Sequence, residues 1–289
     1  MIKYVFFGSP RFAEIVLRKL IDSKFPPIAV VCNPDKPFGR KKEMTPPPTK
    51  LIAEKNGIKV FQPVKIDEDF MRKIKELAPE IFLIAAYSKI LPESLLSIPI
   101  LGSVGVHPSV LPRHRGSSPI QNTILYGDKI GGVTLYILDK DVDHGPVLGA
   151  ETLEVSESVD YLSLEEKLAE LGGKMAPEIL VKYSAGELKP VEQNHELATF
   201  TKKFKTEDGL VDIADLSAAI NGDLDLQVAI DRKIRALNPD PGVYTVKKGK
   251  RIKLLESEVL EGGFVIKKIQ VEGKKPTSIL GVIQGVLLG

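Results

Sequence analysis

The sequence predicts an α/β fold with a parallel-rich sheet, followed by a smaller β-rich domain. Three observations lead to this prediction. Continuous apolar runs alternate with amphipathic helical patterns through the first half of the chain. A polar segment without periodicity then follows a long helical pattern, and short strands with glycine turns come after it. Strands buried on both faces and alternating with helices are typical of a parallel sheet that helices cover on both sides.

Each expected element follows from its local pattern. Expected strands are short apolar runs that end at a turn residue, and expected helices carry apolar residues three or four positions apart. The strands are expected at residues 2–8, 27–32, 58–63, 80–87, 102–108, 131–139 and 145–155. The helices are expected at residues 11–23, 50–57, 67–79, 117–127, 163–186 and 225–239. We expect Gly57 to end the second helix and Asp67 to cap the third.

Length and composition fit two ordinary globular domains. The chain has 289 residues, of which 43% are hydrophobic and 27% charged, and its formal net charge is +2. That charge is too small to indicate a nucleic-acid-binding protein by itself. The single cysteine, Cys32, excludes a disulfide framework and a multi-cysteine metal site, and we expect it to be buried in a strand. Without a signal peptide or a run of about 20 apolar residues, we expect a cytoplasmic protein.

Changes of character along the chain suggest the domain boundaries. We expect a first domain over residues 1–186, a linker over 187–204 and a second domain over 205–289. Residues 186–209 are polar and lack periodicity, which favours a linker. Residues 242–273 are a series of short strands with glycine turns, which favours a small β-rich domain.

Two segments hold the candidate chemistry, "GVHPSVLPRHRG" at residues 105–116 and "LDKDVDHGPVL" at 138–148. His107 follows an expected apolar strand, at the edge of the sheet where open α/β folds bind ligands. Asp143 follows a strand and a turn. Beside His107 its carboxylate would fix the imidazole tautomer and support an imidazolium. The alternative is a hydrogen-bonded loop histidine, and an aspartate that caps a turn whose glycine takes positive φ.

The remaining histidines carry weaker expectations. We expect His114, which lies between two arginines, to be a solvated loop residue, and His195 in the linker to have no chemical role. The role of His144 stays open.

The turn "GSPRFA" has one glycine where a dinucleotide fingerprint needs three, which argues against a nicotinamide or flavin enzyme.

A basic stretch at residues 35–50 lies between a strand and a helix, where a short connection would suffice. It is either a solvated loop or a functional insertion. Phosphate contact is the natural use of its charge.

The two candidate segments together closely resemble the signature of the folate-dependent formyltransferases. The usual pattern there is Asn-x-His-Pro-Ser-Leu-Leu-Pro, with an aspartate in a later Asp-x-Gly turn. Shorter segments resemble the branch of the family that acts on methionyl initiator tRNA: "FFGSPRFA", "NPDKPFGRKK", "AAYSKILP", "TKKFKTEDGLVDI" and "IRALNPDPGVYT". The resemblance implies an α/β, Rossmann-like formyltransferase domain with a parallel-rich twisted sheet. A small C-terminal open β-barrel of OB-like kind, which binds tRNA, is implied to follow it.

The implied reaction transfers the formyl group of 10-formyltetrahydrofolate to the α-amino group of methionyl initiator tRNA, for translation initiation. It needs no metal, and we expect a monomer. His107 and Asp143 match the family's catalytic pair. The implied folate contacts are Ser88, Lys89, Ile90, Leu91, Ser109, Val110, Leu111, Pro112, Leu138, Asp139, Lys140 and Asp141. The implied tRNA contacts are Arg40, Lys41 and Lys42, here named the loop cations, with Lys202, Lys203, Lys247 and Lys248.

One position departs from the family pattern. Gly105 stands where the family has asparagine, whose amide supports the developing oxyanion. Losing such a donor typically costs about a hundred- to thousandfold in rate. We hypothesise that a water in the space beside Gly105 replaces the amide, so that Gly105→Asn raises turnover. A backbone N–H, a slow enzyme, or a glycine that only relaxes the strand end are the alternatives.

Three other functions share parts of this pattern. A nucleotide-sugar N-formyltransferase would share the catalytic domain and the folate, but the basic insertion and the full tail argue against it. The missing asparagine keeps open a 10-formyltetrahydrofolate hydrolase and a non-catalytic RNA-binding relative.

Overall fold

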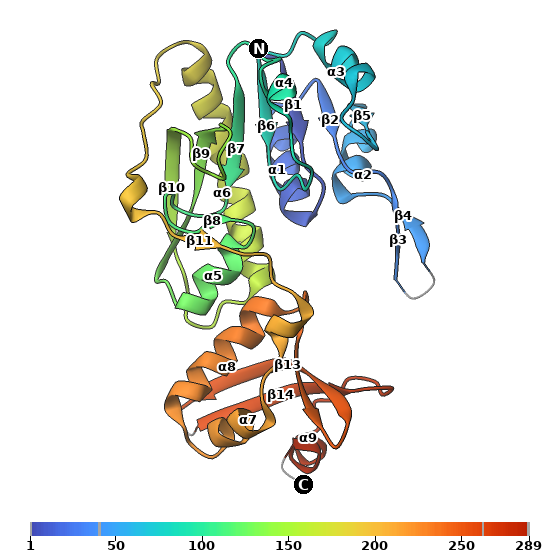
Figure 1. Ribbon diagram of the computed structural model, residues 1–289, viewed down its shortest axis with the longest axis vertical. Coiled ribbons are helices and arrows are strands. Elements are labelled where there is room, and N and C mark those ends of the chain that lie inside the picture. The colour runs from blue at the N-terminus through green and yellow to red at the C-terminus, as the bar shows by residue number, and fades with distance from the viewer. Residues whose placement is uncertain (1, 40–41, 262, 288–289) are drawn as a thin grey trace. The chain divides into compact units, whose positions relative to one another are not determined.

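The computed structural model describes residues 2–39, 42–261 and 263–287, which form two compact units (Figure 1). The first unit comprises the chain up to Arg115, Gly131–Leu153 and Glu165–Phe200. The second unit comprises Gly116–Ile130, Glu154–Leu164 and the chain from Thr201. The chain thus passes between the units several times. The expected boundaries at residues 186 and 204 stay a prediction.

The first unit is built on a seven-stranded sheet with the strand order β10-β9-β7-β6-β1-β2-β5. Its strands are β1 (Tyr4–Phe7), β2 (Ala29–Val31), β5 (Lys59–Phe61), β6 (Ile81–Ile84), β7 (Ser103–His107), β9 (Ile130–Ile137) and β10 (Val147–Glu154). The neighbours from β5 through β7 pair in parallel, whereas β9 runs antiparallel to β7. The predicted parallel-rich α/β sheet is confirmed.

The helices of this part of the chain are α1 (Arg11–Asp22), α2 (Pro48–Lys55), α3 (Glu68–Lys75), α4 (Glu93–Leu96) and α6 (Tyr161–Ser184). The Asp67 side chain accepts a hydrogen bond from the backbone N–H of Phe70, so the predicted cap of α3 is confirmed. Gly57 lies just beyond α2 with a φ of +67°, as a helix-ending glycine should.

Helices α3 and α4 cover one face of the sheet, and α6 covers the other. Val5 and Phe7 pack in the same cluster as Phe70 of α3 and Leu95 of α4. On the opposite face, Gly172 of α6 lies so close to the strands that an added Cβ would be 2.8 Å from Val106 Cγ1. Because side chains alternate along a strand, the residues on either side of Val106 point to the face of α3 and α4. The register therefore decides which residues of β7 meet those of β9 on that face.

A hairpin of β3 (Lys36–Phe38) and β4 (Glu43–Thr45) projects from the first unit (Figure 1). It is the structural form of the basic insertion at residues 35–50. Cys32, just before it, is buried as predicted, but it lies one residue beyond the end of β2 and not in the strand.

The second unit contains a three-stranded antiparallel sheet of β12 (Val243–Lys247), β13 (Lys250–Leu260) and β14 (Gly263–Val271). Its helices are α5 (Pro119–Tyr126), α7 (Ile213–Ile220), α8 (Leu224–Leu237) and α9 (Leu280–Leu287). Helix α8 lies against β13, where Ser257 Oγ donates to Asp231 Oδ1 at 2.8 Å. The predicted small β-rich domain is confirmed, its strands are antiparallel, and α8 lies where a helix was expected. Helices α7 and α9 were not predicted.

Short elements complete the described chain. The two-residue strands β8 (Arg115–Gly116) and β11 (Phe200–Thr201) lie where the chain passes from one unit to the other. Two short 3₁₀ helices span His195–Leu197 and Thr206–Gly209.

Candidate active site

His107 is the last residue of β7, at its carboxyl end. The loop that follows is fastened to the neighbouring strand by one side chain. Thr134 Oγ1 of β9 donates to the Ser109 carbonyl at 2.7 Å and accepts from the Leu111 N–H at 3.0 Å. Ser109 Oγ also donates to the Arg113 carbonyl at 2.6 Å. These bonds fix the path of the loop back towards the imidazole.

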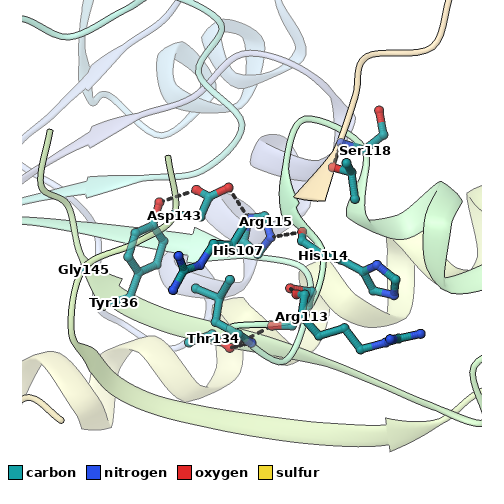
Figure 2. Close-up of polar contacts among 12 residues, drawn as sticks. His107, Arg113, His114, Arg115, Ser118, Thr134, Tyr136, Asp143 and Gly145 are labelled. Carbon is teal, nitrogen blue, oxygen red and sulfur yellow. Dashed lines mark hydrogen bonds and ion pairs between the residues drawn. The ribbon is translucent and has the colours of Figure 1, made fainter. Parts of the chain in front are cut away.

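Both ring nitrogens of His107 face protein acceptors (Figure 2). Nε2 donates to the His114 carbonyl at 2.9 Å, and Nδ1 lies 3.5 Å from Asp143 Oδ2. The bond to the carbonyl requires the proton on Nε2, which leaves the lone pair of the neutral ring on Nδ1. When the imidazole takes up a proton, Nδ1 becomes a donor towards the carboxylate. The structure therefore brings together the two residues that the sequence paired.

The expectation for His114 is wrong. It is 3% exposed rather than solvated, and its φ of +58° turns its carbonyl towards His107. Its backbone N–H donates to Thr199 Oγ1 at 2.8 Å. His114 thus acts through its backbone, which a reading of side-chain chemistry does not detect.

Asp143 is held at both its backbone and its side chain. Asp143 Oδ1 accepts a hydrogen bond from the Tyr136 hydroxyl at 2.6 Å, which leaves Oδ2 towards His107. The alternative reading of this turn expected a positive φ at Gly145. The positive φ lies instead at Asp143, at +49°, so that expectation is wrong. Gly145 is needed for space, because a Cβ there would lie 2.0 Å from the Ile137 carbonyl oxygen.

The antiparallel direction of β9 decides where the aspartate-rich turn begins. The Leu138 N–H donates to the Ser103 carbonyl at 2.8 Å, at the amino end of β7. His107 is four residues further along, about 13 Å at the usual rise of a strand. The turn therefore starts away from the imidazole and must fold back before Asp143 can reach it.

The space beside Gly105 is filled by protein. A Cβ at Gly105 would lie 2.4 Å from Cε1 and 2.8 Å from Cζ of Tyr136, and 2.9 Å from Leu138 Cδ1. No water fits in that volume, so the hypothesis of a water beside Gly105 is wrong. Gly105 is not one of the described residues with a positive φ. A glycine is therefore required here for the space beside the Tyr136 ring and not for the backbone conformation.

Burial governs the chemistry of Tyr136. Desolvation, followed by the negative charge of Asp143, raises the pKa of this phenol well above its usual value. The hydroxyl stays protonated and donates to the carboxylate throughout the physiological range.

Sequence reasoning missed a second polar layer behind Asp143. Gln193 is 7% exposed, and its Nε2 donates to the carbonyls of Asp143 at 3.0 Å and Gly145 at 2.7 Å. Its Oε1 accepts from Arg115 Nη2 at 2.6 Å. Arg115 is 3% exposed, and its Nη2 also lies 2.9 Å from His195 Nδ1. The segment expected to be a linker therefore contributes a buried side chain to this site.

His144 and His195 lie on the outer side of this layer. Their rings stack with centroids 4.1 Å apart, and His144 Nδ1 lies 2.7 Å from Asp139 Oδ2. His195, for which no chemical role was expected, is thus part of the contacts that surround the Asp143 turn.

The expected folate segments follow three strands of the sheet. Ser88–Leu91 follow β6, Ser109–Pro112 follow β7, and Leu138–Asp141 follow β9. In the first segment Ile90 is 93% exposed, and Ser88 Oγ accepts from Asn33 Nδ2 at 3.0 Å. Lys89 Nζ donates to the carbonyls of Pro63 and Val64, and burial lowers the pKa of its ammonium.

The expected tRNA-binding cations have varied surroundings. Lys42 lies in the turn of the β3–β4 hairpin, while Arg40 and Lys41 lie outside the described residues. Lys202 Nζ pairs with Asp208 Oδ1 at 2.8 Å, and Lys203 is exposed. Lys247 Nζ donates to the Leu287 carbonyl at 2.8 Å, and Lys248 lies beside it in the turn between β12 and β13.

Within residues 2–39, 42–261 and 263–287 no group of three or more His, Cys, Asp or Glu side chains is arranged to hold a metal ion. None of the helices described is both long enough and apolar enough to cross a membrane.

Known proteins are similar to this chain over nearly its whole length. Residues 2–180 match the family model described as formyl transferase, and residues 225–264 match its C-terminal domain. The chain is 35% identical to the methionyl-tRNA formyltransferase of Kosmotoga olearia, covering 99% of this chain and 97% of that protein. It is 38% identical to the protein of the same name from Caldanaerobacter subterraneus subsp. tengcongensis, covering 90% and 81%.

Among solved structures, the methionyl-tRNA formyltransferase from Clostridium thermocellum matches with a TM-score of 0.58 at 17% identity, covering 94% of this chain and 98% of that one. This likeness shows the shared fold. The fold is that of an α/β protein in which His107 and Asp143 lie together at the carboxyl end of β7. The chain belongs to the formyl transferase family.

Proposed function

We propose that this chain transfers the formyl group of 10-formyltetrahydrofolate to the α-amino group of methionyl initiator tRNA. The observation that carries the proposal is the His107–Asp143 pair, 3.5 Å apart at the end of β7. It lies within the residues that match the formyl transferase family. The related methionyl-tRNA formyltransferases, 34 to 38% identical, support the choice of acceptor.

The chemistry of formyl transfer suits this pair. The neutral amine attacks the formyl carbon, and a tetrahedral intermediate with an oxyanion forms. The bond from that carbon to the folate nitrogen then breaks. The amine must lose one proton and the folate nitrogen must gain one, so one group can move a single proton between them. We assign this role to His107, with Asp143 balancing the positive charge of the imidazolium.

The site is organised before substrate arrives. His107 is held at Nε2 by the His114 carbonyl, and Asp143 is held at Oδ1 by Tyr136. Neither side chain must be recruited during the reaction, which is the condition for effective electrostatic stabilisation. We place the folate against the loops after β6, β7 and β9, with Ser88–Leu91, Ser109–Pro112 and Leu138–Asp141 as its contacts.

The basic β3–β4 hairpin and the lysines of the second unit are assigned to the tRNA. Cations that neutralise phosphates supply most of the affinity for a nucleic acid. We place the reaction in the cytoplasm, where translation begins, and expect a monomer. The amino-sugar transferase, the folate hydrolase and the non-catalytic relative are less supported, because the relatives at 34 to 38% identity act by name on methionyl-tRNA.

A competition between acceptors tests the proposal. The purified chain is incubated with 10-formyltetrahydrofolate and methionyl initiator tRNA, an amino-sugar nucleotide, or water alone. We expect formylmethionyl-tRNA in the first reaction and neither formylated sugar nor rapid release of formate in the others. Formylation of the sugar alone, or formate release at the same rate in all three, overturns the proposal.

A further inference from the structure

Gly105 and Tyr136 form a pair that has no role in the reaction as described above. The two residues face each other directly in the antiparallel ladder between β7 and β9. Facing residues of an antiparallel pair place their side chains on the same face of the sheet. That face also carries His107, which is paired with Thr134. The register alone therefore puts the Tyr136 ring beside the catalytic histidine.

The ring lies over Gly105 because the glycine has no side chain. A Cβ there would be 2.4 Å from a ring carbon, whereas real Cβ atoms essentially never approach another heavy atom closer than 3.0 Å. Tyr136 is 6% exposed, so the ring is enclosed on its other sides as well. It meets the His107 ring edge-on, with centroids 6.4 Å apart and planes at 87°. Any side chain at Gly105 must displace this ring.

The position of the ring determines where its hydroxyl reaches. The hydroxyl donates to Asp143 Oδ1 at 2.6 Å, and the other oxygen of the same carboxylate faces His107 Nδ1 (Figure 2). A carboxylate with one oxygen anchored cannot rotate freely about its side-chain bonds. The bond from Tyr136 therefore selects the orientation in which Oδ2 serves the imidazole.

We propose that Tyr136 is a positioning residue, seated by Gly105, whose hydroxyl holds Asp143 in the orientation that supports His107. This inference rests on the proposed function, because it concerns the same reaction. It also explains the departure from the family's sequence pattern. With the ring in place, no asparagine side chain fits at Gly105.

The decisive variant is Tyr136→Phe, which keeps the ring over Gly105 and removes only the hydroxyl. We expect kcat to fall about ten- to a hundredfold, because a misplacement of about 1 Å in a catalytic group can cost about a hundredfold in rate. The KM values for folate and tRNA should stay within about twofold, because Tyr136 touches neither substrate in this scheme. Tyr183→Phe is the matched control, since its hydroxyl bonds the Leu101 carbonyl at 3.0 Å in the same unit.

Gly105→Ala and the double variant Gly105→Ala/Tyr136→Phe complete a cycle. If Gly105 acts by seating the hydroxyl, the alanine adds little to the loss that phenylalanine has already caused, and the two effects are strongly non-additive. Gly105→Asn should lower kcat at least as far as Gly105→Ala. If a Gly105 variant fails to fold, Tyr136→Phe decides the question alone.

Several outcomes contradict the proposal. A Tyr136→Phe protein with kcat within twofold of the wild type, or with equal losses in Tyr136→Phe and Tyr183→Phe, overturns it. An unchanged kcat with a raised KM would make Tyr136 a substrate contact instead. A wild-type chain that formylates no acceptor overturns the proposed function as well, so the two failures are distinguishable.

Discussion

Gln193→Ala removes the hydrogen bonds that hold the Asp143 turn from behind. The side chain donates to the Asp143 and Gly145 carbonyls and accepts from the buried guanidinium of Arg115. Two buried neutral bonds contribute about 1 kcal/mol each, and a bond to a charged group about 1.5–3 kcal/mol. The free energy of unfolding should therefore fall by about 3.5–5 kcal/mol. A domain near the middle of the ordinary range of about 5–15 kcal/mol still folds after such a loss.

Urea unfolding of the variant measures this loss, and initial-rate kinetics measures its effect on the site. We expect kcat to fall about tenfold, because the backbone that carries Asp143 is no longer fixed. Glu192→Ala, an exposed neighbour, is the control and should change stability by no more than about 0.5 kcal/mol. Gln193→Glu keeps the acceptor for Arg115 but loses both donors. Its free energy of unfolding should therefore lie between those of the wild type and Gln193→Ala. A Gln193→Ala protein within about 1 kcal/mol of the wild type, with full kcat, would refute this reasoning.

Three further predictions follow from the same structure. His107→Asn should lose at least about a hundredfold in kcat while the chain still unfolds cooperatively in urea, and Asp143→Asn should also be severely slow. Near wild-type turnover in either variant would contradict the pairing of His107 with Asp143. Alanine at all three loop cations should raise the KM for tRNA and leave the KM for folate unchanged. The slope of log affinity for tRNA against log salt concentration should fall by up to about 3. An equal rise in the KM for folate would contradict the assignment of these cations to the tRNA. Two buried phenols, those of Tyr4 and Tyr136, have a raised pKa in the folded chain because of burial, so they stay protonated when the unfolded chain releases protons near pH 10. The free energy of unfolding should then fall above about pH 10, by up to about 1.4 kcal/mol per pH unit for each tyrosine. The fall should be less steep in Tyr136→Phe. A free energy of unfolding that does not change above about pH 10 would contradict this prediction.

Much of the sheet and part of the site could be predicted from sequence because the relevant signals are local. The apolar run that ends at His107 marks both a buried strand and its carboxyl end. The aspartate cap of α3 and the glycine after α2 are equally local, since each requires only neighbouring residues. The motif around Asp143 also suggested its partner, although not its path.

The parts that sequence did not predict depend on distant pairing. Tyr136 reaches Asp143 only because β9 runs antiparallel to β7 in the register that sets it opposite Gly105. The period of two in β9 was a usable signal, since it places Thr134 and Tyr136 on one face. Gln193 gave no such signal, because a polar segment without periodicity looks the same whether it is a linker or a buried strap.

The central claim, that His107 carries formyl transfer to methionyl-tRNA, is tested most directly by following the formyl group itself. Folate labelled in its formyl carbon is mixed with an excess of wild-type enzyme or His107→Asn, and methionyl initiator tRNA is added for a single turnover. We expect the label to enter the methionyl amide rapidly with the wild type and at least about a hundredfold more slowly with the variant. Equal rates in the two proteins, or label that appears only as free formate with the wild type, would contradict the claim.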